Sequence, residues 1–486
     1  KLFRHNELNI INTIIILLPH DWIKLNLKFP SILLEGFEFF VKIHKESKMS
    51  KSISLGKDPV WKLFLNFSIP AVTGMIVTAM YSIVDGIFVG RGVGADGLAA
   101  LNLGYPIVNF GAALSLMFGI GGATLISLNP KDKEFCNRCF SYIIVLNVTA
   151  YLLILLLVVF FNERIIRLMG ANDNLLPMVK AYMYPCTAAL GFLMISNSLN
   201  AVVRNDKAPA YAFISMVIGA VTNIFLDWLF IMKFGFGIFG AAAATGIGQL
   251  FSMLFLVKYF MKPGSRFKFS FENRIKIDIM KKIAAIGFPS FIMEFTVALI
   301  TILFNISFMK YSGEMGVSAF CIVGYVFYIF RMLYNGMGQG IQPIVSYNYG
   351  EKKLDRVEDT FKIGHKISFG IAIVILIWVN FFGSSLIRLF NEDPELIKTA
   401  VHGLRLYASA IIFVGANFIN ISFLQSKDRA KAANILSVLR STVFVLIGLL
   451  ILPKFLGENG IWLALPFSDL MTFLTTLVLK RKTDIF

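Results

Sequence analysis

Residues 61 to 90, WKLFLNFSIPAVTGMIVTAMYSIVDGIFVG, decide the fold class of this chain. The run exceeds the roughly 20 apolar residues that carry an α-helix across the hydrocarbon core of a bilayer. Its charged residues are Lys62 near the start and Asp85 near the end. Such a long apolar run predicts a membrane-spanning helix rather than a helix of a soluble domain.

Runs of the same kind recur along the chain, whose 486 residues are 57% hydrophobic and 15% charged. At roughly 20 residues per span, this length holds about twelve spans joined by short loops and excludes a large soluble catalytic domain. The predicted spans are residues 61–90, 98–128, 138–161, 178–203, 209–232, 239–261, 283–310, 317–347, 363–388, 403–425, 432–453 and 458–479. The sequence therefore predicts an all-α integral membrane protein.

Lysines and arginines gather in alternate loops, which accounts for the formal net charge of +17 without any nucleic-acid partner. The positive-inside rule places these loops and both termini in the cytoplasm. The basic loop residues are Lys131, Lys133, Arg138, Arg204, Lys207, Lys352, Lys353, Arg356, Lys427, Arg429, Lys431, Lys480, Arg481 and Lys482, besides the central loop. We expect a multi-pass protein of the inner (cytoplasmic) membrane with an even number of spans.

The two halves of the sequence resemble each other at a shift of about 219 residues. Pro70 corresponds to Pro289, and Asn129 corresponds to Asn348. Six helices per half predict parallel repeats related by an axis along the membrane normal. The expected architecture is two six-helix lobes related by pseudo-twofold symmetry: an N-lobe at 49–262, a cytoplasmic linker at 263–282 and a C-lobe at 283–486.

Residues 1–48 do not fit this scheme. The apolar run around Ile10 to Leu18 is too short for a span and lacks the flanks of a signal peptide. Met49 begins a polar stretch that leads into the first span. We expect residues 1–48 to be an upstream or non-native segment.

Ionisable residues inside spans are functional candidates, because a charge at mid-bilayer costs roughly 2.5–3.5 kcal/mol on insertion scales. Asp85 lies in the first span and Asp227 in the fifth. Asn223 precedes Asp227 by one helical turn, so the amide and the carboxylate share a helix face. An interfacial position near the outer helix end is the alternative for both carboxylates.

The second half carries Glu294, Arg331 and Asp469 within predicted spans. A role in binding substrate and a purely stabilising ion pair between helices are both open for them.

Cys136 and Cys139 form a single CxxC pair without a second pair or a nearby histidine, so we expect no zinc or redox site there.

Five stretches of the sequence carry a detailed family pattern: KDPVWKLFLNFSIPAVTGMIVTAMYSIVDGIFVGRGVGADGLAALNLGYPI from Lys57, RNDKAPAYAFISMVIGAVTNIFLDWLFI from Arg204, GIFGAAAATGIGQ from Gly237, GFPSFIMEF from Gly287 and GMGQGIQPIVSYNYGEKK from Gly336. These stretches resemble the MATE (multidrug and toxic compound extrusion) family. The resemblance extends from about residue 56 to the C-terminus and favours the DinF-like branch.

This resemblance implies that Asp85, Asn223 and Asp227 bind the coupling cation, either H+ or Na+, with Thr245 as a further ligand. It also implies that Tyr182 and Asn197 join the hydrogen-bond network of that cavity. Glu294, Arg331 and Asp469 remain candidates for the substrate cavity. No catalytic residue, cofactor or obligate protein partner is expected.

The resulting hypothesis is a cation-coupled antiporter that exports amphipathic or cationic organic compounds by alternating access. A lipid-linked oligosaccharide flippase of the same superfamily is the alternative, but it would need a broad cationic groove. A major-facilitator transporter would carry a Gly-x-x-x-Asp-Arg motif between its second and third spans, and NPKDKEFCNR does not supply one. An intramembrane enzyme is disfavoured because neither HExxH nor GxSxG occurs.

Overall fold

The computed structural model describes residues 53–169, 173–262, 267–270, 276–388 and 393–482. All regular secondary structure within these residues is helical. Residues 1–48, which the sequence analysis set apart, lie outside the described residues.

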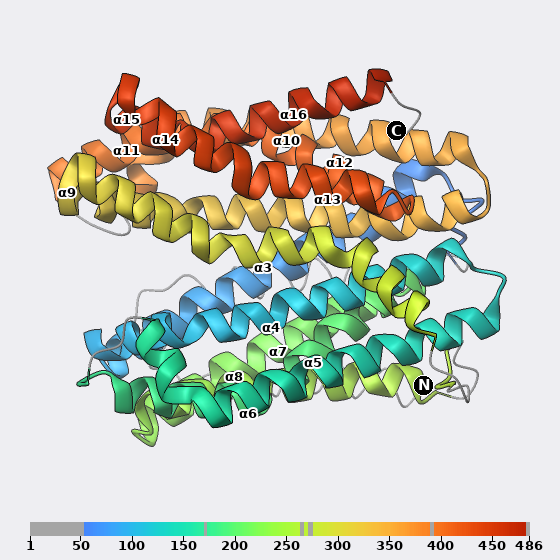
Figure 1. Ribbon diagram of the computed structural model, residues 1–486, viewed down its shortest axis with the longest axis horizontal. Coiled ribbons are helices and arrows are strands. Elements are labelled where there is room, and N and C mark those ends of the chain that lie inside the picture. Colours follow the sequence, from blue (N-terminus) through green and yellow to red (C-terminus); the bar gives the residue numbers. More distant parts are fainter. Residues whose placement is uncertain (1–52, 170–172, 263–266, 271–275, 389–392, 483–486) are drawn as a thin grey trace. The chain divides into compact units, whose positions relative to one another are not determined.

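The elements fall into two consecutive groups, seen in Figure 1 as blue to green and as yellow to red ribbons. The first group consists of α3 (Val60–Gly92), α4 (Ala95–Leu128), α5 (Lys133–Leu168), α6 (Leu176–Asn205), α7 (Pro209–Asp227), the π-helical turn η2 (Trp228–Lys233) and α8 (Gly237–Phe260). The second group consists of α9 (Ile277–Gly350), α10 (Leu354–Arg388), α11 (Pro394–Ala408), α12 (Ile411–Ser426), α13 (Ala430–Val438), the π-helical turn η3 (Leu439–Val443), α14 (Phe444–Leu456), α15 (Glu458–Trp462) and α16 (Ala464–Lys482).

Helix α9 accounts for two membrane spans. Its 74 residues would measure about 110 Å as one straight helix, far more than a bilayer core of about 30 Å. Gly313 interrupts the helix with a φ of 61° and a ψ of −152°. A left-handed φ costs glycine little, so the chain reverses there and α9 folds back on itself.

The remaining spans follow from length and composition. Among the described residues, nine helices are long and apolar enough to cross a membrane, and α11 with α12, bent by 43°, forms a further broken span. Dividing α9 at Gly313 adds one span, and α16, with 19 residues, has the length of a twelfth. The fold class is therefore confirmed as all-α with two six-span lobes, although individual boundaries differ: α9 already begins at Ile277.

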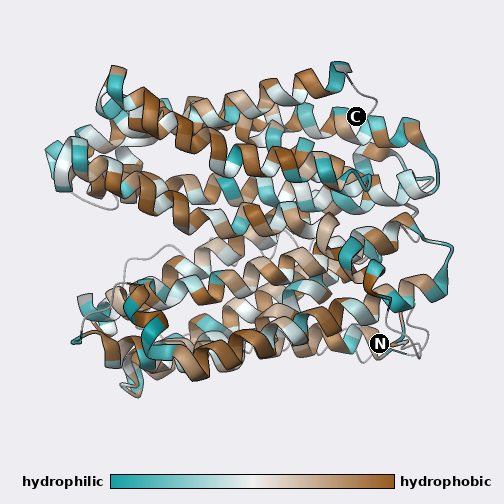
Figure 2. Cartoon of the chain, in the orientation of Figure 1, coloured by the Kyte–Doolittle hydropathy of each residue, from teal (hydrophilic) through white to brown (hydrophobic). Residues whose placement is uncertain are grey.

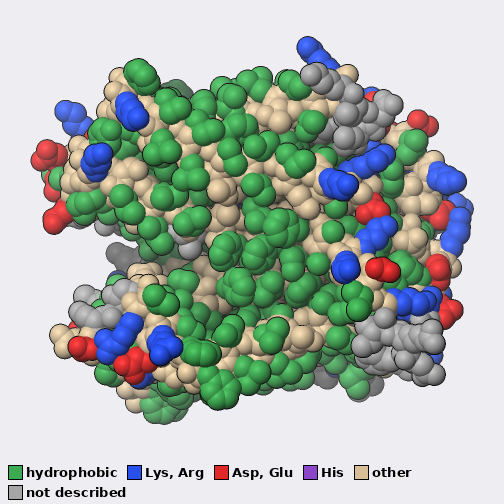
Figure 3. Space-filling view, in the orientation of Figure 1, with side chains coloured by type: hydrophobic (Ala, Val, Ile, Leu, Met, Phe, Trp, Pro, Cys, Tyr) green, Lys and Arg blue, Asp and Glu red, His purple; other side chains and the backbone are tan. Residues whose placement is uncertain are grey.

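The exposed surface is apolar where lipid would cover it. Leu153 and Leu157 on α5 and Val374 and Phe381 on α10 are each more than half exposed. Figure 2 shows brown, hydrophobic residues along the outer helices, and Figure 3 shows the Lys, Arg, Asp and Glu side chains gathered toward the two ends of the helices. This pattern suits a bilayer, in which only the helix ends meet water.

The repeat predicted from sequence recurs in equivalent hydrogen bonds from a side chain to the backbone. Asn129 donates its amide to the carbonyl of Leu125, and Asn348 donates its amide to the carbonyl of Ile344, with distances of 3.0 and 2.8 Å. Both asparagines therefore bond one turn back at the end of the second span of their lobe.

We call the end of the helices that carries residues 129–132, 206–208, 351–353 and 427–429 the basic end. The two lobes touch there: Lys131 pairs with Glu351 at 3.1 Å, and the amide of Gln342 donates to Thr124 at 2.6 Å. Figure 3 shows a hollow between the lobes at the opposite end, on the left of the view.

Several residues assigned to basic loops, such as Arg138 and Arg204, lie in helices instead. Cys136 and Cys139 are buried in the first turns of α5, and Arg204 is buried in the last turn of α6 with 3% of its surface exposed. A polar residue next to an apolar run predicts the end of a span and the start of a loop. The helices in the structure extend past these predicted ends.

Glycines let α4 and α9 approach each other across the lobe interface. A Cβ on Gly287 would lie 1.7 Å from the carbonyl oxygen of Met117, and one on Gly121 would lie 2.0 Å from that of Ile283. Both contacts are with backbone, which cannot move aside as a flexible side chain can. Any side chain at these positions must push the two helices apart.

We expect Gly287→Ala to lower the melting temperature of the purified protein in detergent, because overpacking a close contact typically costs about 1–3 kcal/mol. Gly324→Ala in the same helix is the matched control, since nothing lies within 4 Å of a Cβ placed there. Equal melting temperatures for the two variants would contradict this close contact.

Candidate functional site

The structure brings Asp85, Asn223, Asp227 and Thr245 together inside the N-lobe. The amide of Asn223 donates to the hydroxyl of Thr245 at 3.2 Å, which joins α7 to α8. Asp227 interacts electrostatically with both Asp85 of α3 and Asn223. Asp227 is the last residue of α7 before the π-helical turn η2, and such turns are frequent at functional sites.

Three of the four carboxylate oxygens in this cluster are buried without a hydrogen-bond donor from the described residues. Asp227 is 0% exposed, and neither of its carboxylate oxygens meets a donor from the described residues. The same holds for Oδ1 of Asp85 and for Oδ1 of Asn223. Buried, unpaired carboxylates are costly as anions, so this cluster favours a bound proton or metal cation.

The oxygen atoms present suit either cation. Two carboxylates, an amide oxygen and a hydroxyl are hard ligands, the type that alkali and alkaline-earth cations prefer. Transition-metal chemistry has less support, because no group of three or more His, Cys, Asp or Glu within the described ranges could hold a metal ion. The donor set therefore suits a proton or a Na+ ion.

Tyr182 and Asn197 of α6 occupy different surroundings. Tyr182 is 3% exposed, packs against Gly104 of α4 and interacts electrostatically with Asp85. Asn197 donates its amide to the hydroxyl of Ser115 at 3.1 Å, about four turns closer to the basic end. The structure thus brings Tyr182 near the acidic cluster and sets Asn197 apart from it.

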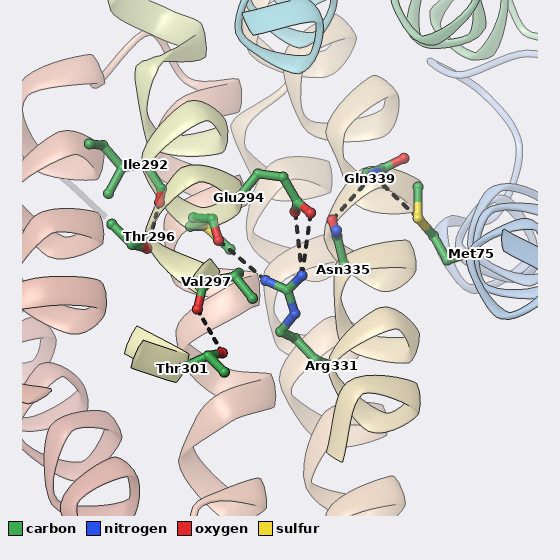
Figure 4. Close-up of polar contacts among 10 residues, drawn as sticks. Met75, Ile292, Glu294, Thr296, Val297, Thr301, Arg331, Asn335 and Gln339 are labelled. Carbon is green, nitrogen blue, oxygen red and sulfur yellow. Dashed lines mark hydrogen bonds and ion pairs between the residues drawn. The ribbon is translucent and has the colours of Figure 1, made fainter. Parts of the chain in front are cut away.

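Glu294 and Arg331 form an ion pair in the C-lobe. Nη2 of Arg331 lies 3.4 Å from Oε1 of Glu294, and Nη1 donates to the carbonyl of Met293 at 3.2 Å. Figure 4 shows the guanidinium pointing at the carboxylate from the other half of α9. Both side chains remain partly exposed, at 16% for Arg331 and 20% for Glu294.

This ion pair lines a pocket between the lobes. Leu116 and Ile120 of the N-lobe form one wall, and α9 and α12 of the C-lobe form the other. The polar residues that share the pocket with Glu294 and Arg331 are Ser290, Asn335, Gln339, Gln342, Ser422 and Gln425. Gln339 donates to Asn335 at 3.2 Å and reaches Met75 of α3 (Figure 4).

These amides and hydroxyls are not among the site residues predicted from the sequence. The signal was present in GMGQGIQP, which places Gln339 and Gln342 inside a predicted span. Polar residues in a span that face neither lipid nor a helix partner indicate a water-accessible cavity.

Asp469 does not belong to this pocket. It is 0% exposed, lies 2.6 Å from Nε of Arg440 and accepts the amide of Asn417 at 2.9 Å. Arg440 also stacks on Phe418, with its guanidinium carbon 4.6 Å from the ring centre. Of the two readings left open for Asp469, these contacts describe an ion pair that joins α16 to η3 and α12.

The family model MatE matches residues 70–229 and 289–450 of this chain. The chain is 25% identical to the Multidrug export protein MepA of Staphylococcus saprophyticus over 426 residues, 87% of this chain and 94% of that protein. Identity to Multidrug export protein MepA of Staphylococcus aureus is also 25%, over 436 residues covering 88% and 95%.

Solved structures share the fold. The MATE multidrug transporter DinF-BH, solved in a complex with a ligand, is 29% identical, with a TM-score of 0.82 over 90% of this chain and 99% of that one. An outward-facing multidrug resistance MATE family transporter of the MOP superfamily is 22% identical, with a TM-score of 0.83 over 89% and 97%, which shows the fold alone.

The two matched segments fall one in each lobe and together cover more than half of the chain. The sequence resemblance to this family is therefore confirmed, and with it the expectation of a transporter rather than an enzyme. This chain belongs to the MatE family of membrane transporters.

Proposed function

We propose that this protein exports amphipathic or cationic organic compounds in exchange for H+ or Na+ by alternating access. The observation that carries the proposal is the pair of a buried Asp227 and a partly buried Asp85 in the N-lobe. Three of their four carboxylate oxygens are shielded from water and meet no hydrogen-bond donor from the described residues. A group that must bind a cation whenever it is shielded from water is suited to couple that cation to a change of conformation.

Coupling then follows from reciprocity. A cation at Asp85 and Asp227 stabilises one arrangement of the lobes, and a substrate in the pocket between the lobes stabilises the other. Each ligand weakens the binding of the other by the same factor, so a cation gradient drives substrate in the opposite direction. Asn223 and Thr245 supply the remaining oxygens for a Na+ ion.

The proposed substrate class rests on relatives and on the pocket. The MepA proteins are described as multidrug exporters, and DinF-BH is described as a multidrug transporter. In this chain the inter-lobe pocket combines apolar walls at Leu116 and Ile120 with the carboxylate of Glu294. An organic cation could displace the guanidinium of Arg331 from that carboxylate, because their separation of 3.4 Å leaves the pair loosely held.

The flippase alternative has less support. A lipid-linked oligosaccharide carries phosphate, which needs several cationic groups without acidic partners. Arg331 is the one cationic side chain among the residues that line the described pocket, and Glu294 is its partner.

The orientation proposed here places the basic end, and both termini, in the cytoplasm of a bacterial inner membrane. The lobes contact each other at that end through Lys131 and Glu351. The arrangement described would then be closed toward the cytoplasm.

We also propose the lobe boundaries 49–262 and 283–486, with the linker at 263–282 and residues 1–48 outside the transport fold.

Gradient-driven efflux from proteoliposomes tests the coupling site. We expect Asp85→Asn and Asp227→Asn each to reduce efflux about 5- to 150-fold, the range of typical coupling free energies. H+ and Na+ gradients are imposed separately, so that the wild type identifies its ion. Asp96→Asn, an exposed carboxylate at the start of α4, is the control and should transport normally. Normal efflux by both site variants would contradict the proposal.

Cysteine labelling tests the orientation. A membrane-impermeant maleimide applied to intact cells should label Asp173→Cys, at the end opposite the basic end, and should label Lys131→Cys only after permeabilisation. Both positions are more than four-fifths exposed, so access to the reagent depends on the side of the membrane alone. The reverse pattern would place the basic end outside.

A further inference from the structure

Arg204 is a buried cation without a carboxylate partner. It is 3% exposed, and no carboxylate from the described part of the chain forms an ion pair with it. Its Nη1 donates to Oδ1 of Asn200 at 2.7 Å, while its Nε is buried and meets no acceptor. Taking a charge out of water without a partner is costly, so such a residue calls for a functional explanation.

Arg204 stands at one end of a line of buried polar side chains on α6. Ser196, Asn200 and Arg204 follow each other at intervals of one helical turn, so they lie on the same face of α6. The hydroxyl of Ser196 lies 2.9 Å from that of Ser252 on α8. The amide of Asn200 donates to Ser215 of α7 at 3.2 Å. These polar groups are each 7% exposed or less.

The other end of this line approaches the acidic cluster. Asn223 of the cluster packs against Gly248 of α8, since a Cβ placed on that glycine would lie 3.2 Å from the Cβ of Asn223. One turn toward the basic end, a Cβ on Gly219 of α7 would lie 3.3 Å from the side chain of Ser252. Because α6 and α8 both end at the basic end, the polar line runs from the acidic cluster to that end.

We infer that Arg204 is an electrostatic barrier that stops cations from crossing the N-lobe between the acidic cluster and the basic end. A polar path through a low-dielectric interior would otherwise let H+ or Na+ run down its gradient without moving substrate. A fixed positive charge in such a path repels cations strongly, since charges interact far more strongly there than in water. This inference rests on the cation exchange proposed above.

Asp206, the nearest acidic residue in sequence, forms no ion pair with Arg204 in the described part of the chain. Asp206 accepts the hydroxyl of Tyr259 at 2.8 Å. Lys207 adds a second positive charge at the same end, 5.5 Å from the ring centre of Tyr347. A structural reading also exists, because a cation in the last turn of a helix stabilises the helix dipole. That reading predicts a loss of stability but no leak of ions.

The test measures cation leak in substrate-free proteoliposomes, with a pH-sensitive dye for H+ and with radioactive sodium for Na+. We expect Arg204→Gln to raise the leak of the coupling ion about tenfold, as the loss of one nearby like charge would. Arg204→Lys keeps the positive charge, so its cation leak should equal that of the wild type. Arg429→Gln, which removes an exposed charge at the basic end of the C-lobe, should also stay tight.

A double variant tests where the path begins. Asp227→Asn added to Arg204→Gln should abolish the leak if the ions pass through the acidic cluster. If Arg204→Gln is not monodisperse after purification, Arg204→Met replaces it, because Met fills a similar volume without charge. The inference is overturned if neither Arg204→Gln nor Arg204→Met raises the leak of H+ or of Na+. It is also overturned if Asp227→Asn leaves the leak of the Arg204 variant unchanged.

This outcome is separable from that of the proposed function. Exchange activity of the single Asp227→Asn variant tests the coupling site, whereas leak in the Arg204 variants is measured without substrate. If Asp227→Asn keeps full exchange while Arg204→Gln leaks, the coupling proposal fails and Arg204 still controls cation passage.

Discussion

The cost of burying charge in a low-dielectric medium governs this structure. Most ionisable side chains lie at the helix ends, and the few inside the lobes are treated in two different ways. Asp469 is neutralised by Arg440 at 2.6 Å and holds three elements of the C-lobe together. Asp85 and Asp227 form no ion pair with a Lys or Arg side chain of the described residues, which is the basis for the cation site proposed above.

The two lobes thus share the same helix arrangement but differ in the pairing of their buried carboxylates. The helix-end asparagines Asn129 and Asn348 bond in the same way in each half. Asp85 and Asp227 of the N-lobe have no cationic partner among the described residues, whereas each C-lobe carboxylate discussed here has an arginine partner. Backbone contact at Gly121 and Gly287 joins the lobes, and a contact this close is either made or broken, which suits a protein that alternates between two arrangements.

Much of the fold could be predicted from the sequence, because a span needs only a long apolar run and such runs are plain around Asp85 and on α5. The meeting of Asp85 with Asp227 could not be derived from periodicity, since helical spacing relates residues within a helix and not between α3 and α7. Thr245 entered only through family resemblance. The pairing of Glu294 with Arg331 depends on the reversal of α9 at Gly313. Arg204 was predicted to lie in a loop because a charge beside an apolar run usually marks a helix end.

Ion release on substrate binding tests the central claim most directly. Substrate is added to the purified protein in weakly buffered detergent solution, and the H+ or Na+ set free is recorded with an indicator or an electrode. The account predicts release by the wild type and none by a protein with both Asp85→Asn and Asp227→Asn. Equal release by the two proteins would show that the coupling cation is bound elsewhere.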